Sequence, residues 1–180
     1  MVQLNKLLGN RRLLCLFQFL ASHPSSEYSY TLLQKKTKLS KATLAKWLAF
    51  LEEERLISLR QIGRNKLYQI KKEHYLVKQL KILSTLSSLN FLVGLSGKFN
   101  IEIYLFGSAA RGEDKEDSDI DLLVISKVKK EEFWPEIKKQ SQILGKTIKL
   151  QVFTPWEWSV MQKKDPAFYE RVEKDKILIR

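Results

Sequence analysis

Cysteine and histidine are scarce in this chain of 180 residues, which contains one cysteine and two histidines. The single thiol, Cys15, excludes an internal disulfide and favours a reducing compartment, and its apolar neighbours predict that it is buried. A Cys/His zinc site is not expected, and no apolar run approaches transmembrane length. Arg11-Arg12 and the following LLCLFQFLA are similar to a short signal peptide. Because Gln18 interrupts that run, we expect a cytoplasmic protein with no membrane partner.

Acidic residues are also few relative to basic ones. The chain has 32 Lys and Arg against 20 Asp and Glu, a net charge of +12 and a pI of about 9.7. Residues 1–75 contain 14 Lys and Arg against 5 Asp and Glu, whereas residues 76–180 contain 18 against 15. The first part of the chain therefore carries most of the positive charge, which favours a polyanionic partner.

The most informative segment is Ile101–Ile125, with the sequence IEIYLFGSAARGEDKEDSDIDLLVI. It contains two apolar runs of strand length, Ile101–Phe106 and Ile120–Ile125. Gly107 and Ser108 follow the first run, where a strand gives way to a helical turn. Glycine lets a ligand approach the backbone closely, and the N–H groups of such a turn can receive a phosphate.

Asp119 and Asp121 stand at the start of the second predicted strand. Side chains two residues apart on a strand share a face, so both carboxylates project together. Paired carboxylates suit a hard divalent cation such as Mg²⁺ or Mn²⁺. A phosphate-binding turn that faces such a pair is the arrangement of phosphoryl and nucleotidyl transfer. The alternative is a pair of strands joined by a solvated acidic loop, with Gly-Ser and Asp-x-Asp at this spacing by chance.

Gly107-Ser108, ten further residues and Asp119-Ile120-Asp121 together resemble the signature of the DNA-polymerase-β-type nucleotidyltransferase superfamily. The embedded Ala-Arg-Gly and the ending Asp-Ser-Asp-Ile-Asp-Leu-Leu-Val resemble its minimal nucleotidyltransferase branch, the antitoxin-like MNT group. The resemblance covers roughly residues 95–180.

The resemblance implies a polymerase-β-like domain in an α/β (α+β) chain, with a small mixed sheet and helices on one side. It implies that Gly107, Ser108 and Arg111 bind an NTP, with ATP expected. It also implies that Asp119 and Asp121 are catalytic and hold Mg²⁺ or Mn²⁺. The reaction would transfer a nucleoside monophosphate to a protein or nucleic-acid acceptor, with loss of pyrophosphate. The antitoxin-like branch adds a HEPN-type toxin as an expected protein partner.

A third acidic residue, which active members of the family contribute from a later strand, is missing. The run Thr147–Phe153 is predicted to be that strand, and it contains no Asp or Glu. Lys149 or Gln151 would occupy the third position, and Glu157 lies on the next predicted helix. A general base contributes a factor of about a hundred to ten thousand, so its loss would impair transfer more than nucleotide binding.

The first 72 residues are predicted to form three helices and a hairpin. The expected helices cover about residues 10–22, 30–36 and 41–55, and the expected strands cover residues 57–62 and 66–70. Ser40 is placed as the N-cap of the third helix. This order of elements resembles a winged helix-turn-helix domain.

Cations and short hydrogen-bond donors on the third helix suit a major groove, and a basic hairpin suits phosphates or the minor groove. Trp47 is expected either exposed, where it would stack on a partner, or half-buried against the wing. The alternatives are an RNA-binding surface, or a dimerisation or protein-docking module. The candidate DNA-binding residues are Lys41, Thr43, Lys46, Trp47, Arg60, Arg64 and Lys66.

A long amphipathic helix is predicted over about residues 73–94, with leucines in register at Leu76, Leu80, Leu83 and Leu86. It would connect the domains rigidly, and its surplus apolar face favours a homodimer. The expected parts are a winged helix over residues 1–72, a bridging helix over 73–96 and a nucleotidyltransferase domain over 97–180. In the last domain, the predicted core anchors include Phe133, Ile137, Ile143, Leu144, Trp156, Trp158 and Met161.

The sequence thus predicts a nucleotidyltransferase-family protein with a DNA-binding winged helix that binds Mg-NTP and transfers a nucleoside monophosphate. The alternative is a catalytically impaired member that acts as a DNA-binding transcriptional regulator or as an antitoxin-like binding protein. Because the Asp-x-Asp pair is present and the third carboxylate is missing, the sequence leaves both open.

Overall fold

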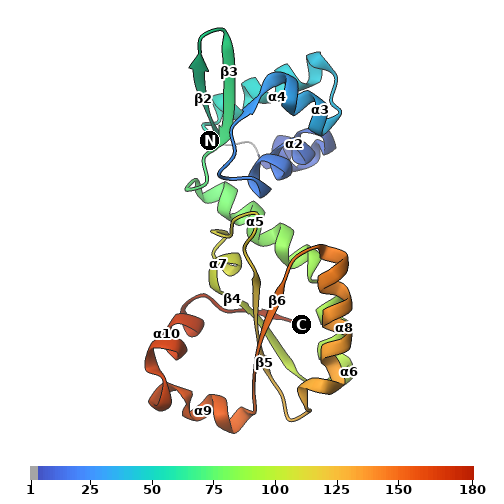
Figure 1. Ribbon diagram of the computed structural model, residues 1–180, viewed down its shortest axis with the longest axis vertical. Helices are drawn as coiled ribbons and strands as arrows, with labels where there is room; N and C mark the ends of the chain where they lie inside the picture. Colours follow the sequence, from blue (N-terminus) through green and yellow to red (C-terminus); the bar gives the residue numbers. More distant parts are fainter. Residues whose placement is uncertain (1–3) are drawn as a thin grey trace. The chain divides into compact units, whose positions relative to one another are not determined.

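The protein divides into two compact units in the computed structural model, which describes residues 4–180 (Figure 1). The first unit ends at Lys81 and the second spans Ile82–Arg180, so the division falls inside the predicted bridging helix. Residues 1–3 of the predicted first domain lie outside the described residues. Each unit combines helices with one small sheet, which confirms the predicted α+β class.

The first unit consists of four helices and a three-stranded antiparallel sheet of order β1-β3-β2. Strands β2 and β3 form a hairpin in which Ile62 pairs with Asn65, so Gly63 and Arg64 make the connection. The elements are α1 (Leu4–Gly9), α2 (Arg11–Ser22), β1 (Tyr28–Ser29), α3 (Tyr30–Thr37), α4 (Lys41–Glu53), β2 (Ile57–Ile62) and β3 (Asn65–Ile70).

Local capping explains where these helices begin and end. The side chain of Asn10 accepts a hydrogen bond from the Leu13 backbone N–H at 3.0 Å, and Ser40 does the same for Thr43 at 3.3 Å, which confirms Ser40 as an N-cap. Helix α4 ends two residues before the predicted Arg55, which adopts a left-handed φ of 58°.

Trp47 belongs to the core of the first unit, and its expected exposure was wrong. Its exposed fraction is 6%, and its ring meets Phe50 edge-on at 6.2 Å. The period of α4 explains this, because Trp47 lies three residues after Leu44 and next to Leu48 on the buried face. Cys15 shows the opposite error, since it is exposed rather than buried.

The predicted long helix is two helices, α5 (Tyr75–Ser88) and α6 (Phe91–Phe99), bent by 54° at the break between them. Leu80 is buried as predicted, whereas Leu83 is 58% exposed. In the described chain, no single helix is long and apolar enough to cross a membrane, although this bent pair reaches the required length and composition.

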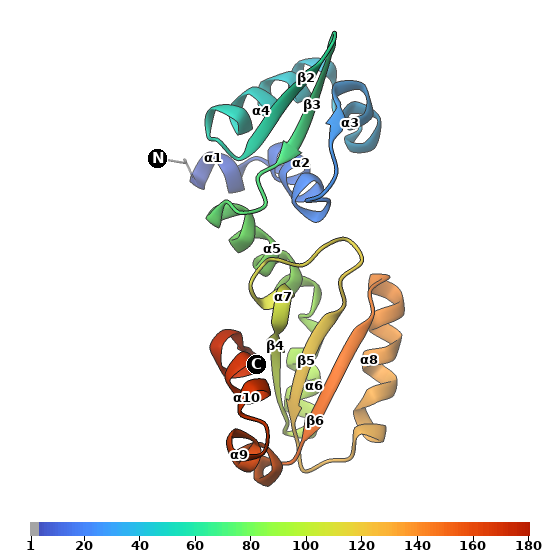
Figure 2. The same ribbon diagram turned by 60° about the vertical axis from the view of Figure 1, so that its left-hand side comes forward.

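The second unit is built on a four-stranded mixed sheet of order β6-β5-β4-β7 (Figure 2). Strands β5 and β6 are parallel, and the other two pairings are antiparallel. Beyond α6, its elements are β4 (Glu102–Phe106), α7 (Gly107–Ala110), β5 (Ile120–Ile125), α8 (Lys130–Leu144), β6 (Ile148–Phe153), α9 (Pro155–Lys164), α10 (Pro166–Asp175) and β7 (Ile177–Ile179).

Helices cover both faces of this sheet, so the expectation of helices on one side was wrong (Figures 1 and 2). One face packs Leu122 and Val124 of β5 against α6 and α8. The other packs Leu123 against Trp158 of α9 and Val172 of α10. Alternation along the strands divides the apolar side chains between the two cores.

Two predicted core anchors of the second unit are exposed instead. Trp156 is 72% exposed and Ile143 is 67% exposed. Trp156 is the second residue of α9, where Thr154 and Glu157 form a capping box, so the first turn is fixed by polar groups. Trp158 and Met161 carry the packing of α9 and are buried as predicted.

Candidate functional site

Three segments of the second unit meet at one end of its sheet. Phe106 of β4 pairs with Asp121 of β5, and Asp121 lies beside Lys149 of the parallel strand β6. Asp121 shares the sheet face of Leu123, which is the face covered by α9 and α10. The Gly-Ser turn, the Asp-x-Asp pair and the strand that lacks a carboxylate therefore converge.

Gly107 holds the turn directly against Asp121. Its φ is +74°, a conformation that L side chains rarely adopt. A Cβ atom at this position would lie 2.8 Å from Asp121 Oδ2 and 3.6 Å from Asp121 Cβ. Glycine is therefore required twice, by backbone conformation and by space, and the backbone of the turn stays accessible beside a carboxylate.

Asp119 forms an ion pair with Lys149, with 2.6 Å between Lys149 Nζ and Asp119 Oδ2. The hydrogen bond and charge of Lys149 lower the pKa of Asp119, and a hydrogen bond from Thr147 adds to this. The same pair raises the pKa of the Lys149 ammonium. Both groups are therefore charged at neutral pH.

Asp121 has a different environment, although it is two residues away. Burial raises its pKa most, and repulsion by Asp119 adds to the rise, while the positive charges of Lys149 and Arg171 oppose it. Arg171, on α10, is exposed, and its guanidinium lies 5.4 Å from the Phe168 ring centroid. Two cations thus act on this carboxylate pair.

Arg111, predicted to neutralise charge during transfer, is held by two carboxylates of its own unit. Its Nε lies 2.9 Å from Glu113, and its Nη1 lies 2.5 Å from Asp175. Hydrogen bonds to Glu113 and Asp175 raise the pKa of the guanidinium. Arg111 thus links the segment after α7 to the end of α10 through its ion pairs with Glu113 and Asp175.

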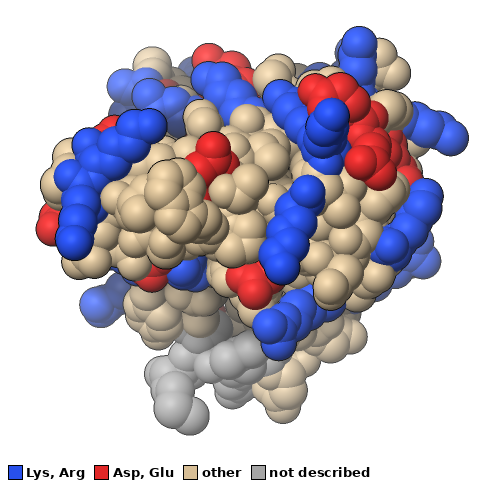
Figure 3. Space-filling view, turned by 90° about the horizontal axis from the view of Figure 1, so that it is seen from below, with Lys and Arg blue, Asp and Glu red and all other residues tan. Residues whose placement is uncertain are grey.

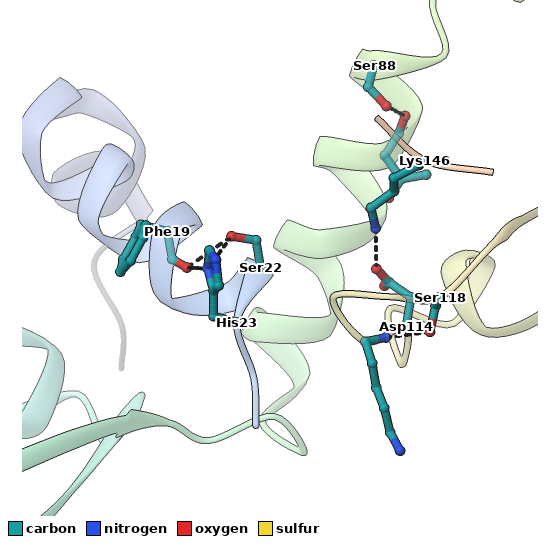
Figure 4. Close-up of polar contacts among 9 residues, drawn as sticks. Phe19, Ser22, His23, Ser88, Asp114, Ser118 and Lys146 are labelled. Carbon is teal, nitrogen blue, oxygen red and sulfur yellow. Dashed lines mark hydrogen bonds and ion pairs between the residues drawn. The ribbon is translucent and has the colours of Figure 1, made fainter. Parts of the chain in front are cut away.

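The acidic segment between α7 and β5 is anchored at Asp114 and Ser118, although Lys115, Glu116 and Asp117 are exposed (Figure 4). Asp114 is 8% exposed, and its Oδ2 lies 3.4 Å from Lys146 Nζ. The hydroxyl of Ser118 accepts a hydrogen bond from the Lys115 backbone N–H at 2.7 Å. These contacts fix the approach of the chain to Asp119.

The residues present do not fit a centre of two divalent metals as they are arranged. The donor set holds the two carboxylates of Asp119 and Asp121, and the ammonium of Lys149 already occupies one oxygen of Asp119. Among residues 4–180, no group of three or more His, Cys, Asp or Glu is placed to hold a metal ion. Mg²⁺ at such sites is held by one or two carboxylates together with water and substrate phosphates, so here a metal ion would first have to displace the ammonium of Lys149 from Asp119.

Comparison with known proteins identifies the second unit. Residues 76–179, more than half of the chain, match the family described as a nucleotidyltransferase domain. The chain belongs to this family. No curated protein matches it. Among solved structures, reduced HlyU from Vibrio cholerae N16961 is 26% identical over 46% of this chain and 83% of that chain, with a TM-score of 0.39.

Nucleotidyltransferase domains generally use divalent metals and act on NTPs. The mixed sheet with flanking helices agrees with this fold. The structure places Gly107 against Asp121, and the charge of Asp119 acts on Asp121. It adds two residues that the sequence signature did not contain, Arg171 and Asp175, which come from the last helix and become visible only when the chain folds.

The candidate DNA-binding residues lie in the first unit, except that Trp47 belongs to its core. Lys41 and Lys46 are exposed on α4, and Lys46 Nζ lies 4.7 Å from the Trp47 ring centroid. Thr43 is half-buried, and its hydroxyl accepts a hydrogen bond from Ser40 at 2.8 Å.

On the hairpin, Arg60 is paired with Glu27 at 2.5 Å. Arg64 and Lys66 are exposed and line a hollow of about 270 Å³ together with Ser29, Tyr30 and Thr31. On the face shown in Figure 3, Lys and Arg side chains lie singly or in small groups among uncharged and acidic side chains. A continuous basic surface is not seen on that face.

Proposed function

We propose that this protein is a DNA-binding regulator whose nucleotidyltransferase-family unit binds a nucleoside triphosphate, with ATP the expected one, and transfers the nucleoside monophosphate from it inefficiently or not at all. The observation that carries this proposal is the ion pair of Lys149 with Asp119, because Lys149 lies in register with Asp121 where active relatives are expected to supply a carboxylate. A lysine cannot act as the missing general base while its ammonium is charged.

Nucleotide binding is supported by the turn at Gly107. Gly107 itself has no side chain, so a ligand can approach its backbone closely on the side away from Asp121. Two exposed cations, Lys149 and Arg171, act on the neighbouring carboxylate and are available to a polyanion. Phosphate groups bind well where backbone N–H groups and ammonium or guanidinium groups converge.

DNA binding is supported by the charge of the first unit. Up to Lys81 the chain contains 16 Lys and Arg against 5 Asp and Glu, whereas Ile82–Arg180 contains 16 against 15. Helices α3 and α4 with the intervening turn, followed by the β2–β3 hairpin, have the order of a winged helix-turn-helix. We propose that α4 enters the major groove and that Arg64 and Lys66 contact phosphates.

The DNA proposal is tested by selection from a random duplex pool, followed by affinity measurement on the enriched sequence. Lys46→Ala should weaken binding to that sequence, because Lys46 is exposed on the proposed recognition helix. Lys139→Ala, which removes an exposed lysine of α8, is the matched control and should bind as the unsubstituted protein does. If no sequence is enriched, and RNA or a protein binds instead, the regulator proposal is overturned.

The nucleotide proposal is tested by calorimetry with ATP and with GTP on the full chain. Gly107→Ala should abolish binding, because the added Cβ forces the turn away from Asp121. Gly94→Ala is the control, since a Cβ at Gly94 meets nothing within 4 Å. Absence of binding to any NTP, with or without Mg²⁺ or Mn²⁺, would contradict the proposal for this unit.

A second candidate function is transfer itself, favoured by the complete Gly-Ser and Asp-x-Asp elements. It predicts incorporation of label from an α-labelled NTP into protein, RNA or DNA, and loss of that incorporation in Asp121→Ala. An antitoxin-like role would instead require a HEPN-type partner, and it predicts a stable complex when the two proteins are expressed together. Homodimers would match DNA sites with two half-sites, and they predict twice the monomer mass in solution.

A further inference from the structure

Lys149 is placed where its ammonium can touch both the carboxylate pair and a bound polyanion. Strand register sets it beside Asp121, and its side chain reaches Asp119 Oδ2 at 2.6 Å. The side chain is nevertheless 62% exposed, so the ammonium is not enclosed by the pair. An ammonium has three donors, so one bond to Asp119 leaves donors for a phosphate oxygen.

Positive side chains already face the carboxyl groups at this end of the sheet. Lys149 acts on both Asp119 and Asp121, and Arg171 acts on Asp121. A site with a third carboxylate in place of Lys149 would carry a net negative charge and would repel a triphosphate until divalent cations were bound. Here the repulsion is already offset by side chains.

A divalent cation would also meet an obstacle that the triphosphate does not. To coordinate both carboxylates it would have to displace the ammonium from Asp119 and remain close to that positive charge. The same ammonium attracts phosphate oxygens, for which lysine is a common partner.

We infer that Lys149 is a built-in cation of the site, which takes the place of a divalent metal and lets the protein hold a nucleoside triphosphate in the absence of magnesium. This inference rests on the proposed nucleotide binding. Lys149 and Arg171 neutralise the phosphates, the Gly107 turn receives them through its backbone, and no bond is made or broken. The unit then reports the level of free nucleotide rather than of its magnesium complex.

The test is calorimetry of ATP with the full chain, in parallel in EDTA and in excess Mg²⁺. The unsubstituted protein should bind in both solutions, with no loss of affinity in EDTA. Lys149→Met should weaken binding in EDTA by about tenfold or more, the value of one charge-assisted contact. Lys149→Arg keeps the charge and should retain binding, and Lys139→Met removes an exposed lysine elsewhere in the unit and should change nothing.

Lys149→Asp replaces the positive charge at this position with a negative one. It should abolish binding in EDTA and create binding that requires Mg²⁺, because it supplies a third carboxylate beside Asp121. Thermal unfolding of each variant checks that it is folded, and Lys149 is exposed enough for these substitutions to be tolerated.

The outcomes separate this inference from the proposed function. Binding that occurs only with Mg²⁺ in the unsubstituted protein overturns the role of Lys149 and leaves nucleotide binding intact. Equal binding in EDTA by Lys149→Met and the unsubstituted protein overturns it as well. Absence of ATP binding in both solutions overturns the proposed nucleotide binding itself, and the inference with it.

Discussion

The backbone of Gly107 and the carboxylate of Asp121 are so close that a Cβ on residue 107 would lie 2.8 Å from Asp121 Oδ2. The contact joins the end of β4 to the start of β5, two strands that pair Phe106 with Asp121. The proposed phosphate-binding turn therefore lies directly beside Asp121. The glycine is therefore a structural requirement of the site as well as a point of ligand approach.

Gly107→Ala should destabilise the second unit by about 1–3 kcal/mol, because alanine is strained at a φ of +74° and its Cβ displaces Asp121. Gly94→Ala, inside α6 with open space around it, should be neutral or stabilising by up to about 1 kcal/mol. Urea unfolding followed by circular dichroism measures both. Equal stability of the two variants would show that the turn relaxes without cost.

Alanine substitution of two tryptophans should change stability by very different amounts, because one side chain is buried and the other is exposed. Trp47→Ala should lower the free energy of unfolding of the first unit by about 3–5 kcal/mol, because it empties a buried ring site. Trp156→Ala should change stability by less than about 0.5 kcal/mol, since the side chain is 72% exposed. Thermal and urea unfolding measure the stability of both variants. A small loss of unfolding free energy in Trp47→Ala would mean that neighbouring side chains move in and replace its contact with Phe50.

The sequence predicted the strands, the caps and the Asp-x-Asp pair because each depends on local pattern. Asn10 and Ser40 are capping residues next to helical periodicity, and the strands around Gly107 are apolar and β-branched. Lys149 or Gln151 was expected at the third position from the family resemblance and the alternation of the strand, and the structure pairs Lys149 with Asp119.

The errors arose where the buried face of a helix, or a contact between residues far apart in the sequence, determines the position of a side chain. Trp47 was placed off the buried face, yet it lies three residues from Leu44 on the buried side of α4. One helix was predicted over residues 73–94, yet the chain bends between Ser88 and Phe91 into a second helix, α6. Arg111 meets Asp175 from the last helix, 64 residues away, a contact that no local pattern contains.

DNA affinity should depend steeply on salt, and the hairpin tip should supply part of that dependence. Each lysine or arginine that neutralises a phosphate adds about 0.9 to the slope of log affinity against log salt. The double variant Arg64→Ala/Lys66→Ala should therefore reduce the slope by about 2 and weaken binding to all sequences alike. Fluorescence anisotropy over a salt series measures it.

The matched control for the salt series is Lys138→Ala/Lys139→Ala, which removes two exposed cations from α8. This variant lowers the net charge of the chain by the same amount but should leave the slope unchanged. If both double variants reduce the slope equally, long-range charge explains the effect and the hairpin tip makes no direct phosphate contact.

The two site carboxylates should respond to acid in opposite directions. Hydrogen bonding by Lys149 lowers the pKa of folded Asp119, so its stabilising contribution is present above the unfolded value of about 3.9 and is lost as the pH falls through the folded pKa. Burial raises the pKa of Asp121, so its contribution is present at low pH and is lost as the pH rises from the unfolded value through the folded one.

Lys149→Met should raise the pKa of both carboxyls, and that of Asp119 by more. Asp119 loses a direct hydrogen bond and a charge, whereas Asp121 loses only the charge that opposes its burial. Carboxyl ¹³C NMR titrations of the unsubstituted protein, Lys149→Met and the control Lys139→Met measure the three sets of pKa values. An unchanged pKa of Asp119 in Lys149→Met would show that the ion pair of Lys149 with Asp119 is not populated in solution.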